Sequence, residues 1–355
     1  MKRARQFVWL SMDTDNPSNA DVVARLGGEG VPMFLVLDPS GGKVALSWYG
    51  TATAPQLGAL MDDGVRVISG GASGPDAVLA RADEANARKD FANAAAFYDQ
   101  ALKLGGEKWP KRPRVIESLI MAQTFARDNK GCAETALRQA PGMARDRSFV
   151  NVIYFGLDCA KAGTPDSEQM EKFAEEAVKI PGVFSDDASQ LHGLLAYRYR
   201  EEKKEGDADR VANDWVAYLR RQLAAAKTPE ARMALDFQLV SAANVLHKPE
   251  IALPEVERAE RELPNEYNPP RLAAGLLSQM GRFDDAMNAC GRALKRIDGA
   301  PKLRLYMTCG GILQRKGDKD AARKMYQEGL DYGQTLPENV AKPALQSLRA
   351  AMSKL

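Results

Sequence analysis

Three stretches of the chain carry small residues at the same two spacings, and this repetition restricts the possible folds more than any other feature. The triplets are Ala82, Ala94 and Ala101, then Ala274, Ala286 and Ala293, and then Gly310, Ala322 and Gly329. In each triplet the gaps are twelve and then seven residues, and the middle holds a turn and a helix start. Two antiparallel helices that cross closely leave room only for glycine or alanine at their contact. We therefore expect helical hairpins.

These hairpins resemble the tetratricopeptide repeat (TPR), because the distance from the turn at Gly281 to the turn at Gly317 is close to the family's period of about 34 residues. The resemblance implies a TPR-like α-solenoid over residues 76–355 with about a dozen helices. Its clearest repeats are 76–104, 267–297 and 303–332. Residues 119–141 look like a degenerate hairpin, and 145–262 like helical pairs without the triplet. We expect one continuous stack, because each hairpin leaves an apolar face that only a neighbour can cover.

The first 66 residues have a different pattern, with short β-rich runs and little helix. Phe7–Leu10 and Met33–Leu37 are apolar on consecutive residues, which predicts strands buried on both faces. The order of the expected elements resembles the later part of the thioredoxin fold, and Pro32 matches that family's cis-proline. The expected elements are a strand at Phe7–Met12, a helix at Ser18–Gly27, a hairpin at Pro32–Tyr49 and a helix at Pro55–Asp62. The predicted fold is thus mostly α, with a partial thioredoxin-like domain (1–66), a linker (67–75) and the repeat domain (76–355).

The thioredoxin-like segment lacks the family's reactive cysteines. A Cys-x-x-Cys pair would precede Phe7–Met12, but the first cysteine of this chain is Cys132. Dithiol exchange needs both sulfurs, so no redox catalysis is expected from residues 1–66. Either the numbered chain begins downstream of the natural start, which we favour, or the redox half was lost and the remnant caps the solenoid. In the thioredoxin family the strand that leads to the Cys-x-x-Cys pair lies between the two strands matched here, so its absence would expose Trp9 and Leu35.

Composition excludes several classes of function. The net charge is +2, which gives no electrostatic reason to expect nucleic acid or a membrane as partner. No stretch approaches the roughly 18 apolar residues of a membrane span. The two histidines, His192 and His247, are far apart, so we expect no metal site, and no motif indicates a cofactor.

The cysteines are predicted to be buried free thiols. Cys132, Cys159, Cys290 and Cys309 form neither a zinc pattern nor a disulfide framework, and a reducing compartment is the default. Cys290 and Cys309 fall on facing helices, so a regulatory disulfide is the alternative there. The localisation stays open.

The resemblance to TPR arrays implies that a partner lies on the concave face made by the first helix of each pair. The candidate residues on this face are Asn268, Arg271, Ser278, Arg304, Met307 and Gln314. Two arginines, amides and a methionine suit a peptide with some acidic character, and an ordinary wet surface is the alternative. Leu79 and Asp83 stand where the carboxylate clamp of chaperone-binding TPR domains needs Lys and Asn, which excludes that clamp. The predicted function is a protein-interaction scaffold; the alternative is a thiol–disulfide oxidoreductase or disulfide chaperone whose reactive half is missing.

Overall fold

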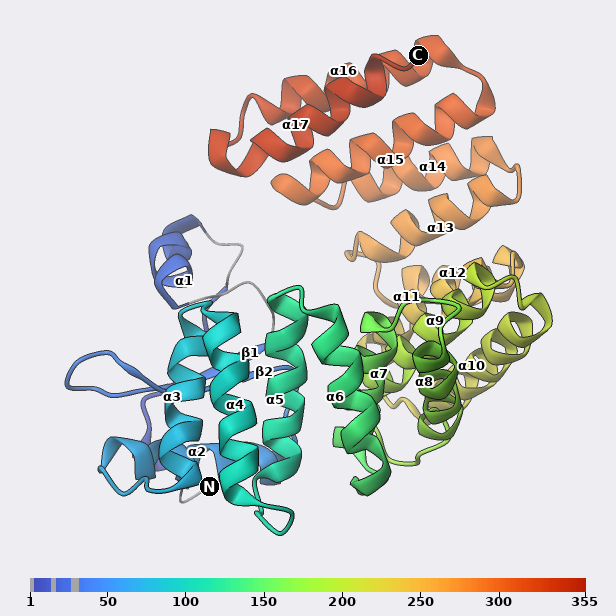
Figure 1. Cartoon of the computed structure of the whole chain (residues 1–355). Helices are drawn as coiled ribbons and strands as arrows, with labels where there is room; N and C mark the ends of the chain where they lie inside the picture. Colours follow the sequence, from blue (N-terminus) through green and yellow to red (C-terminus); the bar gives the residue numbers. More distant parts are fainter. Residues whose placement is uncertain (1–2, 14–16, 27–31) are drawn as a thin grey trace. The chain divides into compact units, whose positions relative to one another are not determined.

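The computed structural model describes residues 3–13, 17–26 and 32–355 of the chain. Within these ranges it holds seventeen α-helices and two strands (Figure 1). The chain divides into two compact units, Met1–Leu194 (unit 1) and Leu195–Leu355 (unit 2), and the boundary falls inside helix α9 (Ser185–Glu201). The fold class is confirmed: the described residues are mostly α-helical, with a small α/β segment at the start.

Unit 1 begins with a β-hairpin and two helices. Short 3₁₀ turns at Arg3–Gln6 and Pro17–Asn19 precede α1 (Ala20–Leu26), β1 (Met33–Leu37), β2 (Val44–Tyr49) and α2 (Ala54–Ile68). The strands pair antiparallel, with Phe34 opposite Trp48. Ser40 closes their turn, because its N–H and its hydroxyl both donate to the Asp38 carboxylate. A capping box at Thr53 starts α2.

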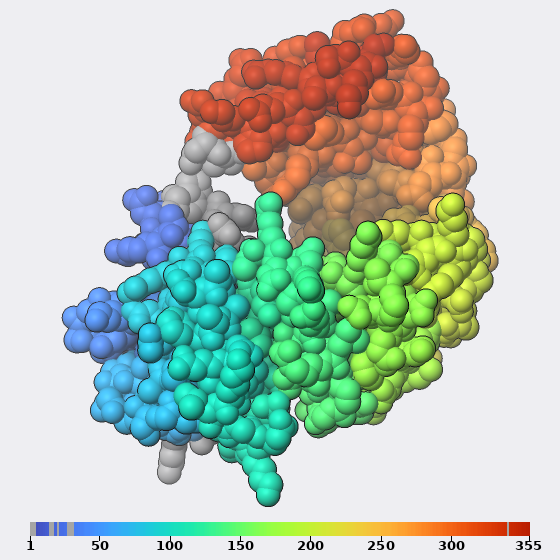
Figure 2. Space-filling model, viewed as in Figure 1, coloured from blue at the N-terminus to red at the C-terminus, as the bar shows by residue number. Residues whose placement is uncertain are grey.

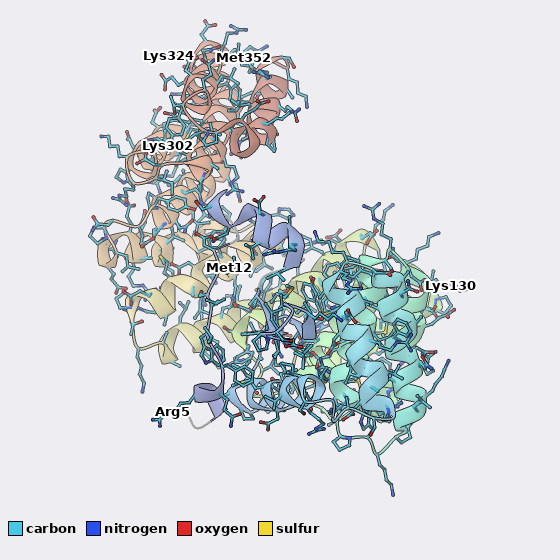
Figure 3. All side chains as sticks on the ribbon, turned by 90° about the vertical axis from the view of Figure 1, so that its left-hand side faces the viewer. Arg5, Met12, Lys130, Lys302, Lys324 and Met352 are labelled. Carbon is cyan, nitrogen blue, oxygen red and sulfur yellow. A yellow bond between two sulfur atoms is a disulfide. The ribbon has the colours of Figure 1, made fainter. Side chains whose placement is uncertain are left out.

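The predicted strand at Phe7–Met12 is wrong. These residues lie outside helix and strand, and Val8 and Leu10 are 89% and 77% exposed. Met12 lies on an irregular stretch of backbone (Figure 3). A strand needs a hydrogen-bonding neighbour, and among the described residues β1 and β2 pair only with each other. Trp9 is 54% exposed, so this segment contributes little to the core.

Seven helical hairpins and a final helix, α17 (Glu338–Met352), make up the rest of the described chain. The hairpins are α3 (Pro75–Ala87) with α4 (Phe91–Gly105), α5 (Arg112–Phe125) with α6 (Asn129–Gln139), α7 (Arg147–Cys159) with α8 (Pro165–Ala177), α9 with α10 (Glu205–Ala225), α11 (Pro229–Val245) with α12 (Leu253–Glu262), α13 (Asn268–Gln279) with α14 (Phe283–Leu294), and α15 (Ala300–Lys316) with α16 (Lys319–Gly333). Short 3₁₀ turns lie at Ala140–Gly142 and Pro249–Ile251. In unit 1 the hairpins follow one another across the surface in chain order (Figure 2). Fifteen helices from Pro75 on exceed the predicted dozen.

Every hairpin turns at one residue with a positive φ. That residue immediately precedes the N-cap of the second helix, or of the 3₁₀ turn before it. The seven are Lys89, Arg127, Gly163, Lys203, His247, Gly281 and Gly317. The same turn therefore builds the central hairpins, although the small-residue triplet is absent there.

The small residues lie at the helix contacts, as predicted. The alanines of all three triplets are fully buried. A Cβ on Gly310 would lie 2.2 Å from Cε1 of Tyr326, and a Cβ on Gly329 would lie 2.8 Å from Cβ of Tyr306. Contacts this short do not occur between real carbon atoms, so backbone and ring touch only because the side chain is absent.

The α/β segment packs on the first helices of unit 1. From β2, Ser47 donates to the backbone carbonyl of Asp83 in α3 (3.0 Å), and its own carbonyl accepts from Arg114 in α5 (3.4 Å). Arg147 in α7 donates to Thr51, just after β2, at 2.6 Å. We call the surface formed by the first helices of successive hairpins the first-helix face. In unit 1 the chain's own β-hairpin covers part of this face.

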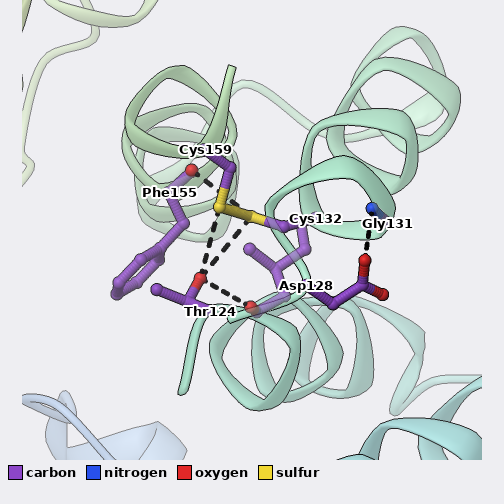
Figure 4. The surroundings of a disulfide bond; sticks show 7 residues. Thr124, Asp128, Gly131, Cys132, Phe155 and Cys159 are labelled. Atoms are coloured by element: carbon purple, nitrogen blue, oxygen red, sulfur yellow. Dashed lines mark hydrogen bonds between the residues drawn. A yellow bond between two sulfur atoms is a disulfide. The ribbon is translucent and has the colours of Figure 1, made fainter. Parts of the chain in front are cut away.

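The prediction of free thiols is wrong. Cys132 bonds to Cys159 (Figure 4) and Cys290 bonds to Cys309, so no cysteine is free. Their predicted burial is correct, because none is more than 7% exposed. Pairing depends on which helices pack side by side, and sequence separations of 27 and 19 residues do not reveal this.

No helix among the described residues is both long and apolar enough to cross a bilayer.

Candidate partner-binding face

The first-helix face of unit 2 is formed by α11, α13 and α15. Gln279 of α13 donates to Asn244 of α11 at 3.0 Å, which joins two of these helices directly. The residues of α13 and α15 include no aspartate or glutamate. Both helices carry arginine, so α13 and α15 bring positive charge and no carboxylate to this face, whereas α11 carries Glu230 and Asp236.

Arg271 is a cation of this face that two neighbouring side chains contact. Its guanidinium lies over the ring of Phe237 at 4.7 Å, and its Nε donates to Asn268 at 3.3 Å. These two contacts use one face of the guanidinium and one of its five N–H donors. The terminal nitrogens form no ion pair with a carboxylate among the described residues. They are the pair of donors that binds a carboxylate with two parallel hydrogen bonds.

Arg304 brings a second positive charge from the neighbouring helix. Burial lowers the pKa of Arg271, and the charge of Arg304 lowers it further, while Tyr267 acts in the opposite direction. Arg304 is itself exposed and forms no ion pair with any described carboxylate. Two such charges on adjacent helices repel each other, so an anion bound between them would be stabilised.

Two glycines leave this face open beside the arginines. Gly275 lies one turn after Arg271, and a Cβ there would meet no atom within 4 Å. At Gly311 the only such atom is the Tyr326 hydroxyl, at 3.9 Å. Unlike Gly310, neither glycine is required by packing, and each one lowers the stability of its helix.

The other predicted site residues are placed less favourably. Ser278 is only 4% exposed, so it lies in the core rather than on the face; its Oγ finds no hydrogen-bond partner among the described residues. Met307 is half-buried against the core of the last hairpin. Gln314 is exposed, but its Oε1 accepts a hydrogen bond from Tyr326. Pro32 is exposed before β1, and its peptide bond to Val31 lies outside the described residues.

Phe237 was missed by the sequence analysis. It is 46% exposed on α11, a helix without the small-residue triplet, so its repeat position was not assigned. The positive φ of His247 identifies α11 as a first helix in the structure, but a histidine gives no sequence signal for such a turn.

A charged cluster in unit 1 is a weaker candidate. A small surface hollow is lined by Asp63, Asp76, Lys111 and others. Lys111 bonds to Asp63 at 2.9 Å and to Asp76 at 2.7 Å. These charges neutralise one another and tie α2 to α3 and α5. Among the described residues there is no group of three or more acidic, histidine or cysteine side chains suited to a metal ion.

Comparisons with known proteins give only remote structural likenesses. No family model and no curated protein matches the chain. A tetratricopeptide repeat protein from Parabacteroides merdae aligns with 78% of this chain and 98% of its own at 11% identity and a TM-score of 0.47. Yeast Tom70 aligns with 79% of this chain and 64% of its own at 14% identity and a TM-score of 0.40. The TPR2AB domain of yeast Sti1, solved as a pHSP90 complex, aligns with 79% of this chain and 98% of its own at 12% identity and a TM-score of 0.28.

Proposed function

We propose that this chain is a protein-interaction scaffold that binds an acidic peptide segment on the first-helix face of unit 2. The proposal rests mainly on the geometry of Arg271, which Phe237 and Asn268 hold in place while its terminal nitrogens form no ion pair with any described carboxylate. A guanidinium held in one orientation loses little side-chain entropy when it binds a carboxylate. The positive charge of Arg304 on the neighbouring helix adds to the attraction for an anion.

The shape of the face favours a peptide as the molecule that supplies the negative charge. Gly275 and Gly311 let a main chain approach α13 and α15 without meeting a Cβ. Exposed Phe237 offers an apolar surface beside the charge. A nucleic acid would need many basic contacts along a backbone, whereas the chain has a net charge of only +2.

A selection from a random-peptide display library on the purified chain tests this function. The recovered peptides are expected to be enriched in Asp, Glu or a free C-terminal carboxylate. The double variant R271E/R304E should bind a recovered peptide at least about 100-fold more weakly, since each of the two arginines loses a charged hydrogen bond that contributes about 1.5–3 kcal/mol. R323E/K324E makes the same charge change on the exposed surface of α16 and should bind like the wild type. Equal loss in both double variants would exclude this face as the site.

For residues 1–66 the proposed role is to cap the repeats. The contacts of Ser47 and Thr51 with α3, α5 and α7 support this role. A thioredoxin-like origin is compatible with the order α1, β1, β2, α2. No observation favours the oxidoreductase alternative, because all four cysteines are bonded far along the chain from this segment. The division into 1–66, 67–75 and 76–355 stays a prediction; residues 1–194 lie in one compact unit.

A further inference from the structure

The two disulfides occupy the same kind of position in the repeat. Cys132 in α6 bonds to Cys159 in α7, and Cys290 in α14 bonds to Cys309 in α15. Each bond joins the second helix of one hairpin to the first helix of the next. The Cα atoms are 6.0 and 5.9 Å apart, close to the usual separation in disulfides.

Both disulfides are enclosed by the protein. Cys132, Cys290 and Cys309 are fully buried and Cys159 is 7% exposed. The Thr124 hydroxyl lies 3.5 Å from each sulfur of the first pair (Figure 4). Thiol–disulfide exchange needs a thiolate to reach a sulfur atom, so bonds buried in this way serve structure rather than exchange.

A bond between hairpins acts on the interface that holds a repeat array together. In such an array each hairpin contacts only its neighbours, so the stability of one interface does not spread to distant ones. The Cys290–Cys309 bond ties the α13–α14 hairpin to α15. It therefore also fixes the spacing between α13, which carries Arg271, and α15, which carries Arg304.

We propose that the chain is a disulfide-locked repeat protein that reaches its native form in an oxidising compartment. Each lock forms when two thiols give up two protons and two electrons to the disulfide of an oxidant protein, which becomes a dithiol. Disulfides of this kind persist in oxidising compartments and are kept reduced elsewhere. This inference is independent of the identity of the partner and of the proposed binding face.

Disulfide mapping of the full chain, produced in an oxidising and in a reducing compartment of one host, tests the proposal. The oxidised protein should show no free thiol when denatured without reductant, and its peptide map should contain only the 132–159 and 290–309 links. Its midpoint of thermal unfolding should exceed that of the reduced protein by roughly 5–10 °C. Free thiols, other pairings, or equal midpoints would overturn the proposal.

Two double variants localise the effect. C290A/C309A should increase hydrogen exchange in α14 and α15 and leave α6 and α7 unchanged, and C132A/C159A should do the reverse. Should a variant fail to fold, reduction of the wild-type protein replaces it with a test of both bonds at once, since both then open together and both interfaces should exchange faster. Unchanged exchange at both interfaces would contradict the lock.

Discussion

Replacing Gly310 by alanine tests whether close backbone contact holds the hairpins together. The new Cβ would lie 2.2 Å from Cε1, 2.5 Å from Cδ1 and 2.7 Å from Cζ of Tyr326. Carbon atoms pack at about 3.5–4.0 Å, so the ring must move by more than about 1 Å. Tyr326 is only 2% exposed, so there is little room for it to move. Overpacking of this kind costs about 1–3 kcal/mol.

Gly275→Ala is the matched control, because Gly275 is also inside a helix of unit 2 but has open space at its Cβ. Both changes gain about 1 kcal/mol of helix propensity, which cancels in the comparison. Urea unfolding of the full chain, followed by circular dichroism, should therefore show Gly310→Ala about 1–3 kcal/mol less stable than Gly275→Ala. The penalty should vanish in a Tyr326→Leu background, where the ring is absent. If Gly310→Ala proves as stable as Gly275→Ala, the packing argument is refuted.

Two further predictions concern stability. Burial raises the pKa of Asp236 to about 7, above its ordinary value of 3.8, although Arg258 acts in the opposite direction. Between pH 3.8 and about 7 the unfolded chain therefore binds fewer protons than the folded chain, so stability falls as the pH rises through this window. In urea unfolding, Asp236→Asn should be about 2–4 kcal/mol more stable than wild type at pH 8 but nearly equal to it at pH 4. Equal stability at pH 8 would show that the buried carboxyl carries no such cost. Lys203 has φ 60°, which disfavours a side chain, so Lys203→Gly should raise stability by about 0.5–1 kcal/mol in thermal unfolding; an unchanged midpoint would show that this backbone conformation carries no such cost.

The regular part of this fold could be predicted from sequence because its physics is local. A residue such as Ala94 or Gly310 must be small wherever two helices cross closely, so its spacing repeats with the hairpin. The segment Phe7–Met12 has the composition of a strand, but composition does not supply a neighbour to pair with. Likewise, nothing in the spacing of Cys132 and Cys159 reveals that α6 and α7 pack side by side.

The candidate site was predicted in part for a related reason. Arg271 and Arg304 were assigned from repeats with the triplet, and the structure places them within reach of each other's charge. Ser278 was assigned in the same way but is buried. It lies seven residues after Arg271, almost two full turns, so the spacing keeps it on the same stripe of the helix and does not reveal which neighbours cover it. Phe237 lies in a hairpin without the triplet, so its alignment with the other first helices required the structure.

The binding face is tested most directly by hydrogen exchange of the full chain, measured with and without a saturating acidic peptide from the display selection. The account predicts slower exchange at the exposed first-helix segments of unit 2, residues 268–279 and 303–316, and no change in α14 and α16. Protection confined to those second helices, or to unit 1, would contradict the central claim that the partner lies on the first-helix face of unit 2.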